Sequence, residues 1–387
     1  MDLIVTAHHL FTPIERIEHP LVFVEDGKIV EVVSREGREV SRGTRLLDLG
    51  DACLVPGFID VHIHGGSGHD VMESDSTALR AVEQLLYRHG VTSYLPTTIT
   101  APLDETLKAV ERLANAIASG QGKGNAGRAR PVGIHLEGPF ISHIRRGVHP
   151  PEDILPPTLE TFQKLWEASR GCVKVITVAP EVEGARAVIA GATARGVCVS
   201  IGHSDADLKA AQDGVAAGAR HATHTFNAMR PLDHRDPGIL AVVLMDDRIS
   251  AEIIADGIHV DPLIVQLFLR AKGADGAVLV TDGTAATGMP NGHYRLGSLD
   301  VEVKDGKCTA DGKLAGSVLT MDKAVQNVMK FASCDLQHAV RLATLNPART
   351  AGLAPQSGTI TVGAFADMVA LSPRGEVRTT IVRGQVA

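Results

Sequence analysis

Eight short apolar runs recur through the middle of the sequence, and helix-like segments separate most of them. The segments between the runs, such as ALRAVEQLLYRHG, carry Ala and Leu at helical spacing. Eight strands that alternate with helices predict an α/β chain folded as a (β/α)8 barrel. The runs are FIDVHIH, VTSYLPTT, PVGIHLEGP, VKVITVAPE, VCVSIGHS, RHATHTFN, ISAEIIADGIH and AVLVTDG.

A doubly wound sheet is the competing architecture for such an alternating chain. That fold needs fewer strands and usually has a phosphate-binding glycine turn after its first strand. Here the first run is followed by GGSG, which lacks the full GxGxxG pattern and opens no clear helix. We therefore favour the barrel and interpret these glycines as making room for a substrate.

Both ends of the chain have short strand-like runs separated by turns. Asp26-Gly27 lies between LVFVE and KIVEVVS, which is a strong hairpin signal, and the C-terminal runs alternate with Gly-rich turns. We predict a small β-sandwich domain built from residues 1–54 and 355–387. The barrel is then expected over residues 55–354, with a β-hairpin insertion near residues 294–316.

Composition excludes several classes of partner. A formal charge of −7 without blocks of like charge argues against nucleic acid and anionic membranes. No run reaches the ~18 apolar residues of a membrane helix, and the N-terminus lacks a signal-peptide pattern. The five cysteines lie far apart without a CxxC pair, as expected of reduced thiols. We predict a cytoplasmic enzyme.

Nearly every apolar run ends in a residue that can bind a metal ion or move a proton. In a (β/α)8 barrel the C-terminal ends of the strands converge on one mouth, where active sites lie. A single histidine at a strand end is more often structural, so the prediction of a site rests on the joint placement of these residues. They are His62, His64, Glu137, His203, His224, His259 and Asp282.

The first run presents two imidazoles in one direction, because His62 and His64 are two residues apart on a strand. Mixed His and carboxylate ligation without cysteine suits Zn²⁺, and also Fe²⁺, Mn²⁺ or Co²⁺. Asp282 could bind the metal weakly or accept a proton from its water. This chemistry is hydrolysis of a polarised carbonyl or C–N bond. His221 is expected on the opposite strand face from His224.

The motif PGFIDVHIHGG resembles the first-strand motif of the amidohydrolase superfamily, and the β-rich termini resemble its accessory domain. Many members carry a carbamylated lysine at the end of the fourth strand, whereas here Lys174 lies at the start of that run and Glu137 is the substitute. Within the superfamily, the motifs are similar to those of the N-acetylglucosamine-6-phosphate deacetylases. These motifs are HLEGPF, RRGVHPPE, GHSDA, HTFNAM, HRDPG, DGIHV and VTDG.

The resemblance implies roles for particular residues. Glu137, His203 and His224 would hold the principal metal, with Zn the favoured ion, and the retained His62 and His64 make a second, condition-dependent site available. Asp282 would be the general base, and His149 would help polarise the acetyl carbonyl. The sugar and its 6-phosphate would contact His149, Asn227, Ala228, Arg235 and His259.

The resemblance further implies a reaction and an assembly. Metal-activated water would hydrolyse N-acetyl-D-glucosamine 6-phosphate to D-glucosamine 6-phosphate and acetate. Because the arginine of the HR pair can come from a neighbouring subunit in this family, Arg235 also implies a homodimer. The alternatives are a deacetylase of N-acetylgalactosamine 6-phosphate, another amidohydrolase-superfamily hydrolase, or a non-catalytic scaffold that kept the barrel.

Overall fold

The computed structural model describes residues 2–36, 45–120 and 126–387, and the barrel predicted for the middle of the chain is present. Neighbouring barrel strands pair in parallel throughout, and the first strand pairs with the second. The strands are, in barrel order, β8 (Phe58–Ile63), β11 (Val91–Thr98), β13 (Ile134–Glu137), β14 (Val173–Val178), β15 (Cys198–Ile201), β16 (His221–Ala222), β17 (Ser250–Ile254) and β18 (Ala277–Val280).

The barrel closes just beyond the end of its eighth strand. The backbone N–H of Asp282 donates to the carbonyl of His62 at 2.9 Å, and the N–H of His64 donates to Gly283 at 2.8 Å. Closure therefore places Asp282 next to the histidines of the first strand. A short strand, β12 (Arg130–Pro131), also pairs with β11.

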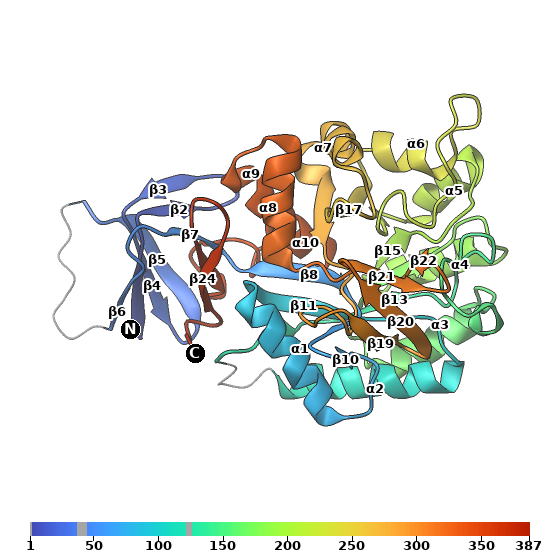
Figure 1. Ribbon diagram of the computed structural model, residues 1–387, viewed down its shortest axis with the longest axis horizontal. Helices are drawn as coiled ribbons and strands as arrows, with labels where there is room; N and C mark the ends of the chain where they lie inside the picture. The colour runs from blue at the N-terminus through green and yellow to red at the C-terminus, as the bar shows by residue number, and fades with distance from the viewer. Residues whose placement is uncertain (1, 37–44, 121–125) are drawn as a thin grey trace.

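Helices surround the strands in the alternation that the sequence predicts (Figure 1). In α2 (Leu103–Ser119), Thr106, Val110, Leu113 and Ile117 are buried, so one stripe of this helix faces the core. Several helices begin at an Asp or Thr whose side chain accepts a backbone N–H. The other helices are α1 (Ser76–Arg88), α3 (Leu159–Ala168), α4 (Ala185–Thr193), α5 (Leu208–Ala217), α6 (Gly238–Met245), α7 (Pro262–Gly276), α8 (Met321–Ala332), α9 (Leu336–Ala343), α10 (Leu345–Thr350) and the 3-10 helix Pro151–Asp153.

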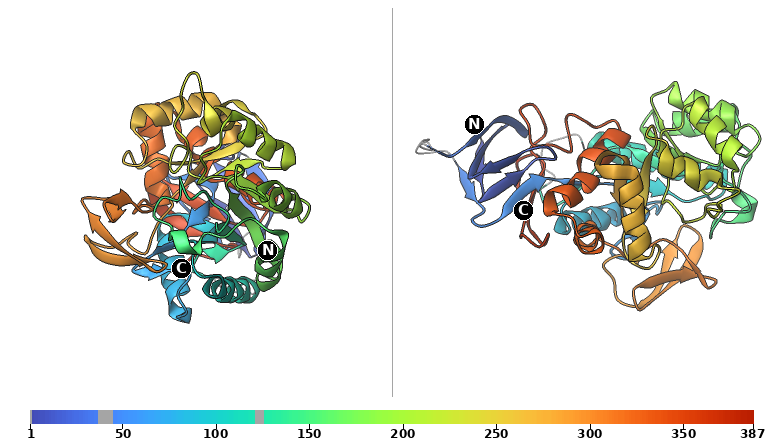
Figure 2. Two further views of the ribbon diagram at one scale, coloured as in Figure 1. Left: turned by 90° about the vertical axis from the view of Figure 1, so that its right-hand side faces the viewer. Right: turned by 90° about the horizontal axis from the view of Figure 1, so that it is seen from above.

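Strands from the two ends of the chain form two further sheets at one end of the molecule, where both termini lie (Figures 1 and 2). One sheet has the order β5-β4-β1-β6 and the other β24-β23-β7-β2-β3. The bounds are β1 (Leu3–Thr6), β2 (His9–Phe11), β3 (Arg16–Glu18), β4 (Pro20–Glu25), β5 (Lys28–Ser34), β6 (Leu46–Asp48), β7 (Cys53–Pro56), β23 (Met368–Leu371) and β24 (Val377–Ile381).

The segment between β18 and α8 forms four antiparallel strands, rather than the two of a hairpin. We call this sheet the flap; its strands are β19 (Gly292–Leu296), β20 (Leu299–Lys304), β21 (Lys307–Ala310) and β22 (Lys313–Leu314). Its inner face packs with Ile99, and the N–H of Gly297 donates to Asp70 at 2.7 Å. Asp70 belongs to β10 (His69–Asp70), which pairs with β9 (Gly65–Gly66). These contacts hold the flap beside the barrel mouth.

Among the described residues, no helix is both long enough and apolar enough to cross a membrane.

Candidate metal centre and active site

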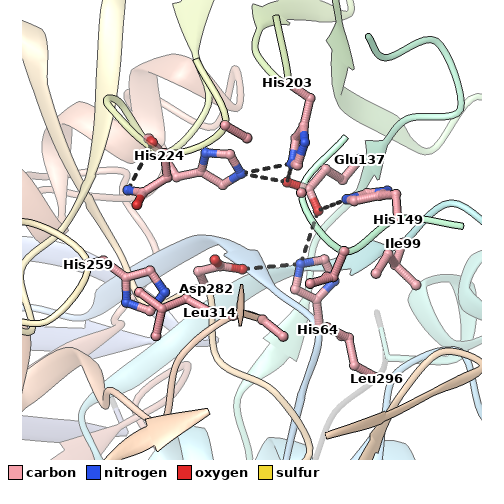
Figure 3. A pocket seen from close by; sticks show the side chains of 16 residues that line it. His64, Ile99, Glu137, His149, His203, His224, His259, Asp282, Leu296 and Leu314 are labelled. Carbon is pink, nitrogen blue, oxygen red and sulfur yellow. Dashed lines mark hydrogen bonds and ion pairs between the residues drawn. The ribbon is translucent and has the colours of Figure 1, made fainter. Parts of the chain in front are cut away.

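A cavity of about 210 Å³ opens at the C-terminal ends of the barrel strands (Figure 3). Its polar walls come from strand ends, and its apolar walls come from Ile99 and the flap residues Leu296 and Leu314. The predicted site residues that line it are His64, Glu137, His149, His203, His224, Asn227, Ala228, His259 and Asp282. His62 is fully buried next to them, whereas Arg235 is exposed on a loop and does not line the cavity.

The chain turns sharply where it delivers these side chains. Glu137 is the last residue of β13, but His203, His224 and Asp282 each follow two residues after their strand has ended. Their φ angles are 48°, 24° and 50°, in a region that residues other than glycine rarely adopt. Such backbone costs roughly 1–3 kcal/mol per residue and tends to occur at functional sites.

Glu137 lies between two pairs of histidines, and its Oε1 contacts His62 at 3.4 Å as well as the pair His203 and His224. Its Oε1 is 3.2 Å from His203 Nε2 and 2.9 Å from His224 Nε2, and these two nitrogens are 3.1 Å apart. Its Oε2 is 3.3 Å from His64 Nε2, which is in turn 3.3 Å from His62 Nε2. Asp282 Oδ1 completes the second group, 3.2 Å from His64 Nε2 and 3.5 Å from His62 Nε2.

The hydrogen bonds of these rings show that the donor set fits a cation. Nδ1 of His203 faces the carbonyl of Arg145 at 2.9 Å, and Nδ1 of His64 faces the carbonyl of Thr97 at 3.0 Å. A carbonyl only accepts, so the single proton of each neutral ring lies on Nδ1. Each Nε2 then faces carboxylate oxygens, which only accept, so either a second ring proton or a metal cation lies between them.

The pKa values of these groups also indicate that the site favours positive charge. Burial alone would lower the pKa of His64, but its hydrogen bonds to Asp282 and Glu137 raise the pKa to about 9. Burial alone would raise the pKa of both carboxyls. The neighbouring imidazoles, His62 first, hold the pKa of Glu137 well below its ordinary range and lower that of Asp282.

His149 has the opposite electrostatic character. Burial and the neighbouring His203 lower its pKa to about 4, so the ring is neutral. The backbone N–H of Thr100 points at its Nδ1 at 3.3 Å, which makes Nδ1 an acceptor and leaves the proton on Nε2. That Nε2 lies 3.5 Å from Glu137 Oε2, so His149 offers a neutral N–H donor inside the cavity.

Of the predicted sugar-binding residues, Asn227, Ala228 and His259 line the cavity together with His149, whereas Arg235 does not. Nδ1 of His259 is 2.7 Å from the Asp256 carboxylate, which fixes the ring, and Figure 3 shows His259 across the site from Ile99 and His149. The Asn227 side-chain amide donates to the carbonyl of His224 at 3.3 Å. Ala228, with φ 49°, belongs to the same sharp turn.

A second layer of polar residues under the cavity was missed by the sequence prediction. His221 is buried inside the barrel, 3.1 Å from Glu252, so the expectation that it lies on the opposite strand face from His224 is wrong, although His221 does not line the cavity. The strand ends at Ala222, so the two-residue alternation used for that prediction does not extend to His224. The available signal was Glu252 itself, a charged residue within the apolar run ISAEII.

A larger hollow, of about 620 Å³, lies at the other end of the barrel strands. Two of its four basic residues pair with carboxylates, Arg248 with Asp246 at 2.6 Å and Arg349 with Asp275 at 2.8 Å. The other two contact helix ends: Arg220 donates to the carbonyl of Val215 at 2.9 Å, and Lys272 donates to that of Val243 at 2.8 Å. Such contacts satisfy the unpaired carbonyls of helix C-termini. They account for the charge there without a ligand.

Comparisons by family, by sequence and by structure all match this chain to the same type of enzyme. The model of the amidohydrolase family matches residues 53–387. N-acetylglucosamine-6-phosphate deacetylases are 36% identical in Bacillus subtilis, over 100% of this chain and 97% of that protein, and 39% identical in Homo sapiens, over 94% and 90%. A mutant of the Mycobacterium smegmatis enzyme, solved in complex with N-acetyl-D-glucosamine-6-phosphate, is 33% identical with a TM-score of 0.91, covering 100% of this chain and 99% of that one.

Proposed function

This chain belongs to the amidohydrolase family and, within it, to the N-acetylglucosamine-6-phosphate deacetylases, and we infer the function of the cavity from that membership. It hydrolyses N-acetyl-D-glucosamine 6-phosphate to D-glucosamine 6-phosphate and acetate. We assign this function to particular residues because Glu137, His203, His224 and Asp282 all line the same cavity. An N-acetylgalactosamine substrate is not favoured, because the relatives act on the glucosamine compound.

The enzyme depends on a divalent metal ion. Glu137, His203 and His224 would hold the principal ion, and His62 and His64 would hold a second one with Glu137 as a shared ligand. When bound, the ion polarises the acetyl carbonyl and makes a water acidic enough to attack near neutral pH. We propose zinc, because nitrogen and oxygen donors without cysteine suit it; iron, manganese and cobalt suit the same donors.

Asp282 moves the proton in this proposal. Its carboxylate takes a proton from the attacking water as the new C–O bond forms on the acetyl carbon. It then delivers that proton to the amide nitrogen as the C–N bond breaks and the free amine leaves. Because the pKa of Asp282 is lowered, its carboxyl group is ionised near neutral pH and can accept this proton. The His149 Nε2–H donates to the acetyl oxygen as negative charge develops there.

The substrate has one orientation that matches the walls of the cavity. His259, Asn227 and the N–H of Ala228 would bind the sugar and its 6-phosphate on one side. The acetyl methyl would then point past Asp282 to the opposite side, where Ile99 and Leu296 lie near His64 (Figure 3). An apolar end of the cavity matches a methyl group.

The direct test is acetate release by protein of known metal content. We expect rapid turnover of N-acetylglucosamine 6-phosphate, a large loss when a chelator removes the metal, and much slower turnover of unphosphorylated N-acetylglucosamine. N-acetylgalactosamine 6-phosphate is the matched control, because it differs at one sugar hydroxyl. Metal-loaded protein that leaves the glucosamine substrate intact would contradict the proposed function.

We further propose a homodimer in which the partner subunit's Arg235 binds the phosphate, since Arg235 is exposed outside its own cavity. Arg235→Ala and Asp282→Asn should each be nearly inactive alone. If the arginine acts across the interface, mixed dimers of the two variants have one complete site. A refolded 1:1 mixture should then recover roughly a quarter of the wild-type sites. An arginine that acts within its own subunit would give no recovery.

A further inference from the structure

Glu252, on β17, is fully buried in the barrel and does not line the cavity. Its Oε2 is 2.9 Å from Nδ1 of His62 and accepts the backbone N–H of His224 at 2.9 Å. Its Oε1 is 3.1 Å from Nε2 of His221. One carboxylate therefore contacts the ring of one proposed metal ligand and the backbone of another.

The contact with His62 decides which ring nitrogen is free. When Nδ1–H donates to Glu252, the lone pair of the neutral ring lies on Nε2. Nε2 is the atom that faces the site, 3.3 Å from His64 Nε2 and 3.4 Å from Glu137 Oε1. A carboxylate partner on the far nitrogen also makes the imidazole a stronger ligand.

The other proposed histidine ligands are oriented by weaker means. His64 and His203 donate Nδ1–H to backbone carbonyls, and Nδ1 of His224 has no hydrogen-bond partner among the described residues. His62 is thus the member of this set that is paired with a full negative charge. Without Glu252, the carboxylates that contact these rings within the described part of the chain would be Glu137 and Asp282, and they would face two divalent cations.

Glu252 is not a ligand of a separate buried ion. His135 comes close enough to His62 and Glu252 for the three to form a metal-sized group. However, both nitrogens of His135 are occupied, Nδ1 by the carbonyl of Val61 at 3.0 Å and Nε2 by the hydroxyl of Thr177 at 2.9 Å. The role left for Glu252 is to support His62.

We propose that Glu252 is a positioning residue that holds His62 with Nε2 free for metal and supplies the charge that retains an ion at the His62–His64 site. The proposal rests on the metal-dependent function above. It also separates the two sites, because Glu252 touches the ring of a ligand in only one of them. Its loss should weaken that site and leave the His203–His224 site nearly intact.

The test is a titration of metal-free protein with Co²⁺, followed by visible absorption and by elemental analysis after dialysis. Wild type should bind two equivalents at saturating Co²⁺, the second more weakly than the first. Glu252→Gln should bind the first equivalent as wild type does and the second about 10- to 100-fold more weakly. Asp60→Asn is the matched control, and this variant should bind like wild type. Asp60 is a buried carboxylate that accepts the backbone N–H of His62 at 3.3 Å and the Thr281 hydroxyl at 2.6 Å, and among the described residues it has no hydrogen bond to an imidazole.

A double variant distinguishes positioning from general damage to the barrel. His62→Asn should remove the second equivalent, and adding Glu252→Gln to it should cause no further loss of metal binding. If Glu252→Gln does not fold, Glu252→Asp keeps the charge on a shorter side chain and should still weaken only the second equivalent.

Three results would overturn the proposal: wild-type binding of a single equivalent at saturating Co²⁺, a Glu252 variant that binds both equivalents normally, or one that weakens both alike. Failure of the proposed function is visible separately, as protein with both metals that releases no acetate from the sugar phosphate.

Discussion

The small domain at the chain ends and the mouth of the barrel bury opposite kinds of side chain. The core of the small domain consists of residues such as Leu10, Leu54 and Ile381, all of which are fully buried. The barrel mouth buries carboxyl groups instead, including Glu137, Glu252 and Asp282, together with their histidine partners.

The difference shows which part of the molecule stabilises the fold and which part lowers its stability. Burying an apolar side chain such as Leu stabilises the fold by about 1.5–3 kcal/mol, whereas a buried charge destabilises it unless it is paired. The small domain and the outer shell of the barrel therefore stabilise a mouth that is strained and charged. Substitutions should separate activity from stability according to the region in which they fall.

The sharpest separation is expected at Asp282. Asp282→Asn keeps the shape of the side chain but cannot accept the proton, so kcat should fall roughly 10²–10⁴-fold. The melting temperature should fall by only about a few degrees, because Asn keeps the side-chain shape but no longer provides the carboxylate that pairs with His64 at 3.2 Å. Steady-state kinetics and thermal unfolding measure the two effects. Asp300→Asn, at a side chain that is 82% exposed, is the control; a variant at Asp282 with more than a tenth of wild-type kcat would contradict the assignment.

The reverse separation is expected in the small domain. Leu10→Ala should lower the free energy of unfolding by about 2–5 kcal/mol, because it leaves a cavity in a closed apolar core. The kcat of the folded variant should be unchanged, since Leu10 belongs to β2 in the small-domain core and does not line the cavity. Denaturant unfolding gives the stability, and Leu263→Ala, at a 70% exposed side chain, is the matched control. A large loss of kcat in folded Leu10→Ala protein would show that the regions are coupled.

The pH dependence of stability should distinguish Asp60, whose pKa is raised, from Glu137 and Asp282, whose pKa values are lowered. Burial raises the pKa of Asp60 to about 7 from its ordinary 3.8, so the folded state holds a proton that the unfolded state has lost. Stability from this group is therefore present at acidic pH and is lost as pH rises from about 4 to 7, by at most about 4 kcal/mol.

Metal-free Asp60→Asn should lack this slope. Its stability relative to wild type should rise with pH over the same window, as measured by denaturant unfolding at several pH values. A constant difference between the two proteins from pH 4 to 8 would mean that Asp60 titrates normally.

The smallest predicted effect concerns the apolar end of the cavity. Ile99→Ala enlarges the space proposed for the acetyl methyl, so kcat/KM for the N-propionyl analogue should rise about tenfold relative to the N-acetyl substrate. The control is Ile144→Ala, at a 74% exposed side chain outside the cavity. An unchanged ratio would place the acyl group elsewhere.

Much of this arrangement could be predicted from the sequence because it is local. Alternating runs and helical segments predicted the barrel, and residues at the ends of the runs, such as Glu137, pointed to the mouth. The number of strands in the flap was underestimated, because turn signals indicate that strands exist but not how many of them pair in one sheet. Strand periodicity also failed at His221, where the strand ends earlier than the apolar pattern does.

The sequence by itself determined the alternation of strands and helices, and which side chains capable of binding metal follow the strands. Only the tertiary structure decided which of these side chains meet. His62 and Glu252 are 190 positions apart and lie on the first and seventh strands, yet their atoms are 2.9 Å apart. Closure of the barrel creates that contact. Pairing of distant side chains depends on the register and curvature of the whole sheet, which no local pattern of residues encodes.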